Sequence, residues 1–247
     1  MTIIAFNRYW VIRWPWLLVN LLAFMLLLGL SYWQWQRAAE KTKTLARIAY
    51  SEQQGPIRIS ELSTLAYKDR DGANLDFTAR WLSPMVWLID NQMVEGRIGY
   101  DVLIAVKDKS ASAEAGALLV NLGWIAAPPQ RELLPEVVIP EQFRVQGIFR
   151  TRTQGILLGT NIENRGVWPM RIQQVNSELL AGYLDEPLIS GLLYQQNTSP
   201  FLIHYRPVIL PPERHKAYAL QWLLLAIALV VIALVASAKK YPQGIEP

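Results

Sequence analysis

The residues best suited to chemistry lie at the N-terminal end of a long apolar run near the C-terminus. Four of them occur at positions i, i+3, i+6 and i+7 and so share one stripe of a helix: His215, Tyr218, Gln221 and Trp222. A neutral imidazole with aromatic rings beside it can ligate the iron of a haem. The alternative is a belt of interfacial side chains that sets the depth of a membrane helix.

A second polar and aromatic group, Trp33, Gln34 and Arg37, lies at the end of the first apolar run. If the two runs are antiparallel helices, Trp33 and Gln34 meet Gln221 and Trp222 at one level of the membrane. Glutamine can then hydrogen-bond across the helices for about 1 kcal/mol. Arg37 can pair with an anionic group such as a haem propionate, or it can extend its guanidinium to the lipid headgroups.

Other chemistries find little support. The chain has no cysteine and only two histidines, His204 and His215, so we predict no metal site. P-loop, GxGxxG, GxSxG and HExxH motifs are absent from the sequence. His204 is predicted to be a strand residue with a satisfied hydrogen bond. We therefore predict that the protein has no catalytic residues and is not an enzyme.

Two uncharged runs must position these residues, at 14–36 and at 217–238. The second covers about 33 Å as a helix, which is enough to cross the hydrocarbon core of a bilayer. A cleaved signal peptide is the alternative for the first run. That run ends in bulky SYWQWQR rather than in small residues, so we predict an uncleaved membrane helix.

The distribution of charge predicts the topology. Of the 24 basic residues, all but four lie between the two runs, as do all but one of the 20 acidic residues, so the middle is nearly neutral. The surplus sits in the tails, 1–13 and 239–247, which we predict to be cytoplasmic. The domain at 55–214 is then extracytoplasmic, and no basic surface for a nucleic acid is evident.

Between the runs the pattern changes from helix to strand. Helix formers continue the first helix to about residue 54, and Gly55-Pro56 ends it. Short segments rich in Val, Ile, Leu and aromatics follow, including FTARWL, PMVWLID, GYDVLIAV, ALLVNLGWI and GILLG. We predict a mainly β domain, an antiparallel barrel or sandwich, with one or two short helices, one of them at 174–184.

Several stretches together resemble the surfeit locus protein 1 family, the cytochrome c oxidase assembly factors of bacterial and mitochondrial inner membranes. The matching stretches are WQWQRAAEK, DNQ followed by GY, LLVNLGWI with Arg131 and Pro135, VWP, and HKAYALQW. Their order and the flanking runs also agree. The chain departs from the family pattern at Leu122, where arginine is usual, at Ala217, Leu223 and Trp81.

The resemblance implies a role in building the haem a site of oxidase subunit I, in a bacterial inner membrane with the middle domain periplasmic. The histidine proposed to contact haem a corresponds to His215. By this resemblance the expected partners are subunit I, a haem a synthase and the lipid bilayer, with haem a as a transient cofactor. The alternative is a membrane-anchored scaffold of the respiratory chain that holds proteins and never binds haem.

Overall fold

The computed structural model describes residues 2–5, 8–11, 13–110, 116–151, 161–164 and 166–240, with side chains described within 13–238. The chain divides into two compact units. The first joins Met1–Leu45 to Val208–Pro247, and the second is Ala46–Pro207. Each unit is described by itself.

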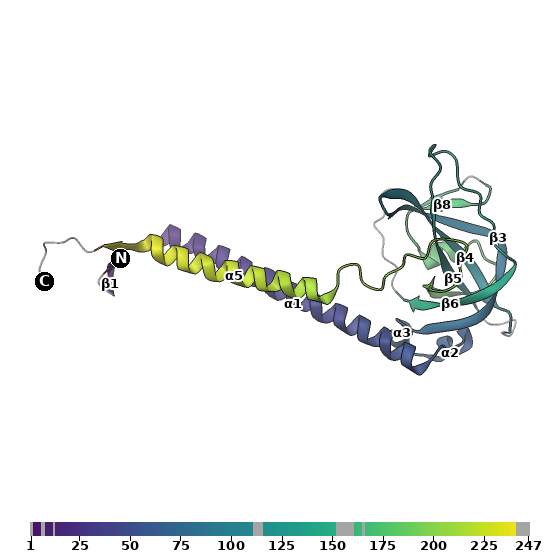
Figure 1. Cartoon of the computed structure of the whole chain (residues 1–247), viewed down its shortest axis with the longest axis horizontal. Coiled ribbons are helices and arrows are strands. Elements are labelled where there is room, and N and C mark those ends of the chain that lie inside the picture. The colour runs from purple at the N-terminus through teal and green to yellow at the C-terminus, as the bar shows by residue number, and fades with distance from the viewer. Residues whose placement is uncertain are drawn as a thin grey trace, which may run out of the picture. The chain divides into compact units, whose positions relative to one another are not determined.

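The first unit is built on two long helices that lie side by side, α1 (Trp14–Gln54) and α5 (Pro212–Ser237) (Figure 1). Both are long and apolar enough to cross a membrane. Their less exposed residues recur at alternating spacings of three and four, which is the seam of two paired helices. On α1 this seam is Asn20, Phe24, Leu27, Ser31, Gln34 and Ala38, and on α5 it is Pro212, His215, Ala219, Trp222, Ala226, Leu229 and Ala233.

Outside the seam the two helices expose large apolar side chains, such as Leu22, Leu26, Ile232 and Val235. A surface of this kind is stable in lipid rather than in water. The two helices therefore indicate a membrane protein. α1 then continues as one helix to Gln54, and Gly55 follows in the left-handed region with φ +85°, a conformation that ends helices.

The chain termini carry a small antiparallel sheet. β2 (Arg8–Val11) pairs with β1 (Thr2–Ala5) on one side and with β10 (Ala238–Lys240) on the other. The two ends of the chain therefore meet at the same end of the helix pair. The described side chains begin at residue 13 and end at residue 238. Those of β1 and β2, Trp10 among them, and of the last two residues of β10 lie outside this range.

The second unit is mainly β. Its elements in order are α2 (Ile59–Thr64), α3 (Tyr67–Arg70), β3 (Asn74–Val94), β4 (Arg97–Asp108), β5 (Ala117–Ala126), β6 (Gln142–Arg150), β7 (Ile162–Glu163), β8 (Met170–Ile172), α4 (Ser177–Ala181) and β9 (Leu188–Gln195). The seven strands form one mixed sheet in the order β4-β5-β9-β6-β3-β8-β7, and β4 also pairs with β3.

The extra pairing of β4 with β3 closes five of these strands into a barrel. β3, β4 and β5 follow one another as antiparallel neighbours, and β6 returns to lie antiparallel to β3. β9 then lies between β5 and β6, parallel to β5 and antiparallel to β6. This is a five-stranded Greek-key barrel, the architecture of the OB-fold class.

β3 serves both the barrel and a second sheet layer. Its pairing with β4 shifts register between Trp81 and Val86, at Pro84, where a proline is tolerated because the ladder is interrupted. The first half pairs with β6, and the second half pairs in parallel with β8. The segments FTARWL and PMVWLID, which the sequence presents as separate strands, are thus the two halves of one bent strand.

Both faces of the central strands are buried, which explains their unbroken apolar runs. Val102, Ile104 and Val106 of β4 point into the barrel core with Leu118 and Val120 of β5. The residues between them point the opposite way, into a second core. That core is covered by β8 and α4 and includes Leu103, Ala105, Leu119, Trp87, Ile172 and Leu180. Neighbouring residues of one strand lie on opposite faces, so two cores require continuous hydrophobicity.

The predicted fold class, two long apolar helices flanking a mainly β domain, is confirmed. The sheet is mixed rather than antiparallel, because β5–β9 and β3–β8 are parallel pairs. Three short helices are present among the described residues, and the helix expected at 174–184 is limited to Ser177–Ala181. The predicted strand GILLG falls within 152–160, outside the described residues.

Gly99 provides a test of the barrel packing. A Cβ at this position would collide with the carbonyl oxygen of Ile125 and the indole of Trp124. We expect Gly99→Ala to reduce the free energy of unfolding by about 2 kcal/mol or more, because backbone cannot move aside cheaply. The measurement is thermal unfolding of the full-length chain in detergent, followed by near-ultraviolet circular dichroism.

The matched control is Gly182→Ala, whose Cβ would lie 3.4 Å from its nearest neighbour, the carbonyl oxygen of Leu179. This contact is ordinary, so the control variant should unfold close to wild type. Equal stability of both variants would contradict the packing described for Gly99.

Candidate functional site

Two polar contacts join the paired helices at one end of α5. The Nδ1 atom of His215 lies 2.7 Å from Oε1 of Gln34, and the hydroxyl of Ser31 donates to the carbonyl oxygen of Ala219 at 2.8 Å. His215 is only 9% exposed, because α1 covers its ring. Polar groups between membrane helices gain by pairing with each other, so these contacts set how the helices align.

This alignment differs from the predicted one. Gln34 stands opposite His215, whereas Trp222 is seven residues further along α5, about 10 Å away along the helix axis. Trp33 and Gln34 therefore do not share a level with Gln221 and Trp222. The physical reason is that the imidazole and the hydroxyl, rather than the two amides, find partners across the seam.

The predicted stripe on α5 is divided between two surfaces. His215 and Trp222 lie on the seam toward α1, together with Ala219. Tyr218 is 41% exposed and Gln221 is also exposed. A stripe of i, i+3, i+6 and i+7 spans too wide an angle to face one partner helix, so the seam takes only the positions at i, i+4 and i+7.

The predicted residues of α1 also divide. Gln34 is in the seam, while Trp33 and Arg37 are exposed. The guanidinium of Arg37 lies 5.7 Å from the centroid of the Trp33 ring, and its Nη1 is 3.1 Å from Oε2 of Glu40. Because both partners of this ion pair are exposed, it adds little stability and leaves the cation available. Close by, Gln36 donates to the hydroxyl of Tyr32 at 2.7 Å.

In the β unit, Asp101 is the centre of a buried polar network. It is 6% exposed, accepts from Asn121 Nδ2 at 2.8 Å, and lies 2.6 Å from Nε2 of His204. The bond to Asp101 raises the pKa of His204, although burial opposes the shift. Asn121 also accepts from the backbone N–H of Gly123 at 2.8 Å. The predicted hydrogen bond of His204 is therefore confirmed. The prediction that His204 is a strand residue is wrong, because the segment forms only an isolated bridge at Leu202 and His204 lies outside the strands.

A second network is organised around Arg171, a buried cation that sequence reasoning missed. Its guanidinium bonds to Glu163 at 2.7 Å, to the hydroxyl of Tyr100 at 3.2 Å, and to the carbonyl oxygen of Arg131. Arg131 in turn donates to the buried carboxylate of Asp90 at 2.7 Å. The signal in the sequence was a single arginine between Met170 and Ile172, since a cation within an apolar strand needs partners.

These networks join the motifs that are scattered along the sequence. Asp90 and Gln92 come from DNQ, Tyr100 from GY, and Trp124 from LLVNLGWI. The indole N–H of Trp124 donates to the carbonyl oxygen of Gln92 at 3.1 Å. The ring of Trp168, from VWP, packs edge to face against the ring of Trp87, with 5.3 Å between the ring centroids. Within the β unit the motifs are therefore structural ties between strands and loops.

Asp71 joins the end of α1 to the barrel. It lies 3.3 Å from Nη1 of Arg47 on α1 and 2.9 Å from Nε of Arg150 on β6. Arg150 also donates to the hydroxyl of Tyr205 at 2.8 Å, and Tyr205 stacks on Tyr194 with 3.7 Å between ring centroids. The last residues of α1 and the segment that leaves the β unit are thus both tied to it.

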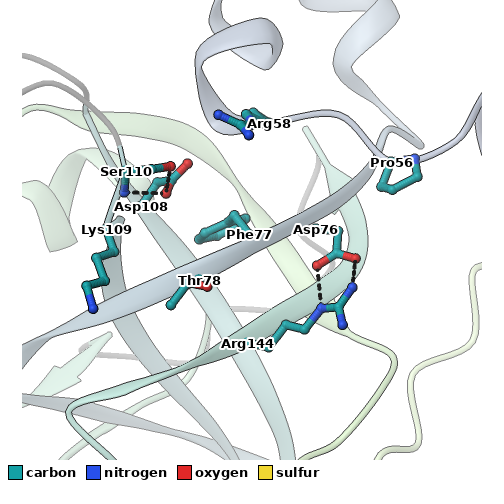
Figure 2. Close-up of a pocket in the computed structure, with 9 residues that line it drawn as sticks. All are labelled: Pro56, Arg58, Asp76, Phe77, Thr78, Asp108, Lys109, Ser110 and Arg144. Carbon is teal, nitrogen blue, oxygen red and sulfur yellow. Dashed lines mark hydrogen bonds and ion pairs between the residues drawn. The ribbon is translucent and has the colours of Figure 1, made fainter.

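The β unit also carries an open groove of about 660 Å³ (Figure 2). Some of its charged side chains have partners among the lining residues. Arg144 forms two hydrogen bonds with Asp76, at 2.8 and 2.6 Å, and they hold the pKa of Asp76 below its usual range. Asp108 accepts from both the backbone and the hydroxyl of Ser110. None of the predicted site residues lines this groove.

Among the described residues no group of three His, Asp or Glu side chains can hold a metal ion. A comparison with curated proteins finds no match. The SURF1 family matches residues 21–227, which covers the whole β unit and most of both helices. The chain belongs to the SURF1 family. Members of this family are known as cytochrome oxidase assembly factors and are not enzymes.

In this SURF1 protein the two histidines have different hydrogen-bond partners. The β unit uses its histidine, His204, within a network of protein groups. His215, at the end of the helix pair, has only an amide as its described partner. Each histidine thus has one ring nitrogen bonded to a described partner, Nε2 in His204 and Nδ1 in His215.

The Asp101–His204 bond predicts a pH dependence. The pKa of His204 is raised in the native state. The bond therefore contributes its full stabilisation of the native state when the pH is below 6.5, the ordinary pKa of histidine. This stabilisation is lost as the pH rises through the raised native pKa. We expect wild type to have the higher melting temperature, and its difference from His204→Gln to be larger at about pH 5.5 than at about pH 9. If the melting temperatures of the two proteins change with pH in the same way, the bond does not titrate.

Proposed function

We propose that this SURF1 protein assists the insertion of haem a into subunit I of a cytochrome c oxidase, using the end of the helix pair that carries His215. The observation that carries the proposal is the contact of Nδ1 of His215 with an amide oxygen, which leaves Nε2 for an external ligand. Family membership supplies the link to oxidase assembly.

The residues present fit the chemistry of haem. A histidine that ligates metal through one nitrogen is usually held by a hydrogen bond at the other, as His215 is by Gln34. Large apolar and aromatic side chains near this end, Trp33 and Tyr218, suit a macrocycle, and Arg37 suits its carboxylates. When bound, haem a would supply an iron that can accept an imidazole as a ligand.

Burial of the imidazole favours transient binding. At 9% exposure the ring is covered by α1, so access to Nε2 requires the helices to part locally. The cost of that opening lowers the apparent affinity, since only the opened population binds. A weak, reversible site is suited to a protein that passes a cofactor to subunit I or receives it from a haem a synthase.

The charge of the tails supports the proposed orientation. Arg8, Arg13, Lys239 and Lys240 flank the two helices at the end where the chain begins and finishes, against one acidic residue, Glu246. By the positive-inside rule this end is cytoplasmic. The β unit is then periplasmic, in a bacterial inner membrane.

A second candidate function is a protein scaffold that never contacts haem. The observation that favours it is the exposure of Tyr32, Trp33 and Trp35 on α1, at 64%, 49% and 60%. Exposed aromatics of this kind are enriched in protein interfaces. In this case His215 would serve only to align the two helices.

The two functions are separated by the visible absorption spectrum of the full-length protein, purified in detergent from cells that make haem a. We expect wild type to carry haem a, and His215→Ala to lose at least about tenfold in affinity because the proposed iron ligand is removed. His204→Gln is the matched control, since it alters the other histidine, and should retain the pigment.

If His215→Ala binds haem a as tightly as wild type, ligation by His215 is wrong. A colourless wild-type protein that purifies with an oxidase subunit supports the scaffold. In cells that lack the gene, we expect the haem a content of the oxidase to fall, and oxidase activity equal to wild type would refute the assembly role.

A further inference from the structure

We infer that Gln34 is a positioning residue that holds His215 in the neutral Nδ1–H tautomer, so that the lone pair is on Nε2. The inference about the tautomer stands on geometry alone, and its consequence for haem rests on the proposed function. It concerns a residue on the other helix, 181 positions away in the sequence.

The acceptor determines the tautomer. The Gln34 atom in contact is Oε1, at 2.7 Å from Nδ1, and an amide oxygen carries no proton. The proton of this bond must therefore come from Nδ1. In a neutral imidazole the other nitrogen is then an acceptor, and Nε2 holds the lone pair that a metal requires.

The partner of the ring is a neutral amide. Among the described residues, Gln34 is the one that hydrogen-bonds to the imidazole, and no carboxylate does so. Only a neutral imidazole can ligate a metal.

The surrounding contacts allow Gln34 to be replaced without separating the helices. One turn away, Ser31 holds the carbonyl oxygen of Ala219 at 2.8 Å. Ala38, 2% exposed, and Pro212 continue the buried seam on the other side. We therefore expect Gln34→Leu to keep the helix pair and to remove the hydrogen bond to the imidazole.

The test is nuclear magnetic resonance of the full-length protein with ¹⁵N-labelled histidine, in nanodiscs and at a pH where both rings are neutral. The chain has only two histidines, so in the His204→Gln variant every histidine signal comes from His215. We expect the Nδ1–H tautomer in this background. Adding Gln34→Leu should produce a mixture of tautomers, and Gln34→Glu, which keeps an oxygen acceptor, should restore Nδ1–H.

The matched control is Gln36→Leu, which removes the same residue type two positions further along α1. Its amide bonds to the hydroxyl of Tyr32 rather than to the histidine, so the tautomer should not change. An Nε2–H tautomer in the protein with Gln34 would overturn the inference. An Nδ1–H tautomer that persists in Gln34→Leu would overturn it as well.

Haem binding separates this inference from the proposed function. With haem a as the probe, we expect Gln34→Leu to bind about 10- to 100-fold more weakly than Gln36→Leu, as for the loss of other groups that orient a metal ligand. A wild-type protein with the Nδ1–H tautomer but no haem affinity contradicts the proposed function alone. Equal haem affinity of the two variants, with His215→Ala impaired, contradicts the role of Gln34 in binding.

Discussion

The alignment of the two long helices depends on polar groups that must find partners away from water. Along most of the seam, Leu, Ala and Phe side chains permit several alignments, because apolar surfaces are alike in lipid. Gln34 with His215 and Ser31 with Ala219 allow only one. These contacts select which residues of the two helix ends are buried between them and which are left for a partner.

The β unit meets a related constraint by a different route. Closing five strands into a barrel buries one face of the central strands, and β8 with α4 buries the other. The cations and carboxylates that remain inside, Arg171, Asp90 and Asp101, are each bonded to protein groups. The motifs that identify the family belong largely to these bonds, and so they report on the stability of the domain rather than on a reactive centre.

Sequence reasoning succeeded where a pattern depends on neighbours along the chain. Uncharged runs predict the two helices, and short β-branched segments predict strands, since both follow from local geometry and burial. It was less successful with longer-range arrangement. A bend at Pro84 joins two predicted strands into one, and the parallel pair of β5 and β9 follows from closure of the barrel. Arg171 was missed because its partners come from distant segments.

The sequence by itself determined that this protein has two long apolar helices, a mainly β domain between them, and one histidine at the end of a helix beside aromatic residues. Only the tertiary structure decided that Gln34, rather than Gln221, meets the other helix through a polar bond. Helical periodicity gives the face on which a residue lies, whereas the level at which two helices meet depends on contacts between side chains far apart in the chain.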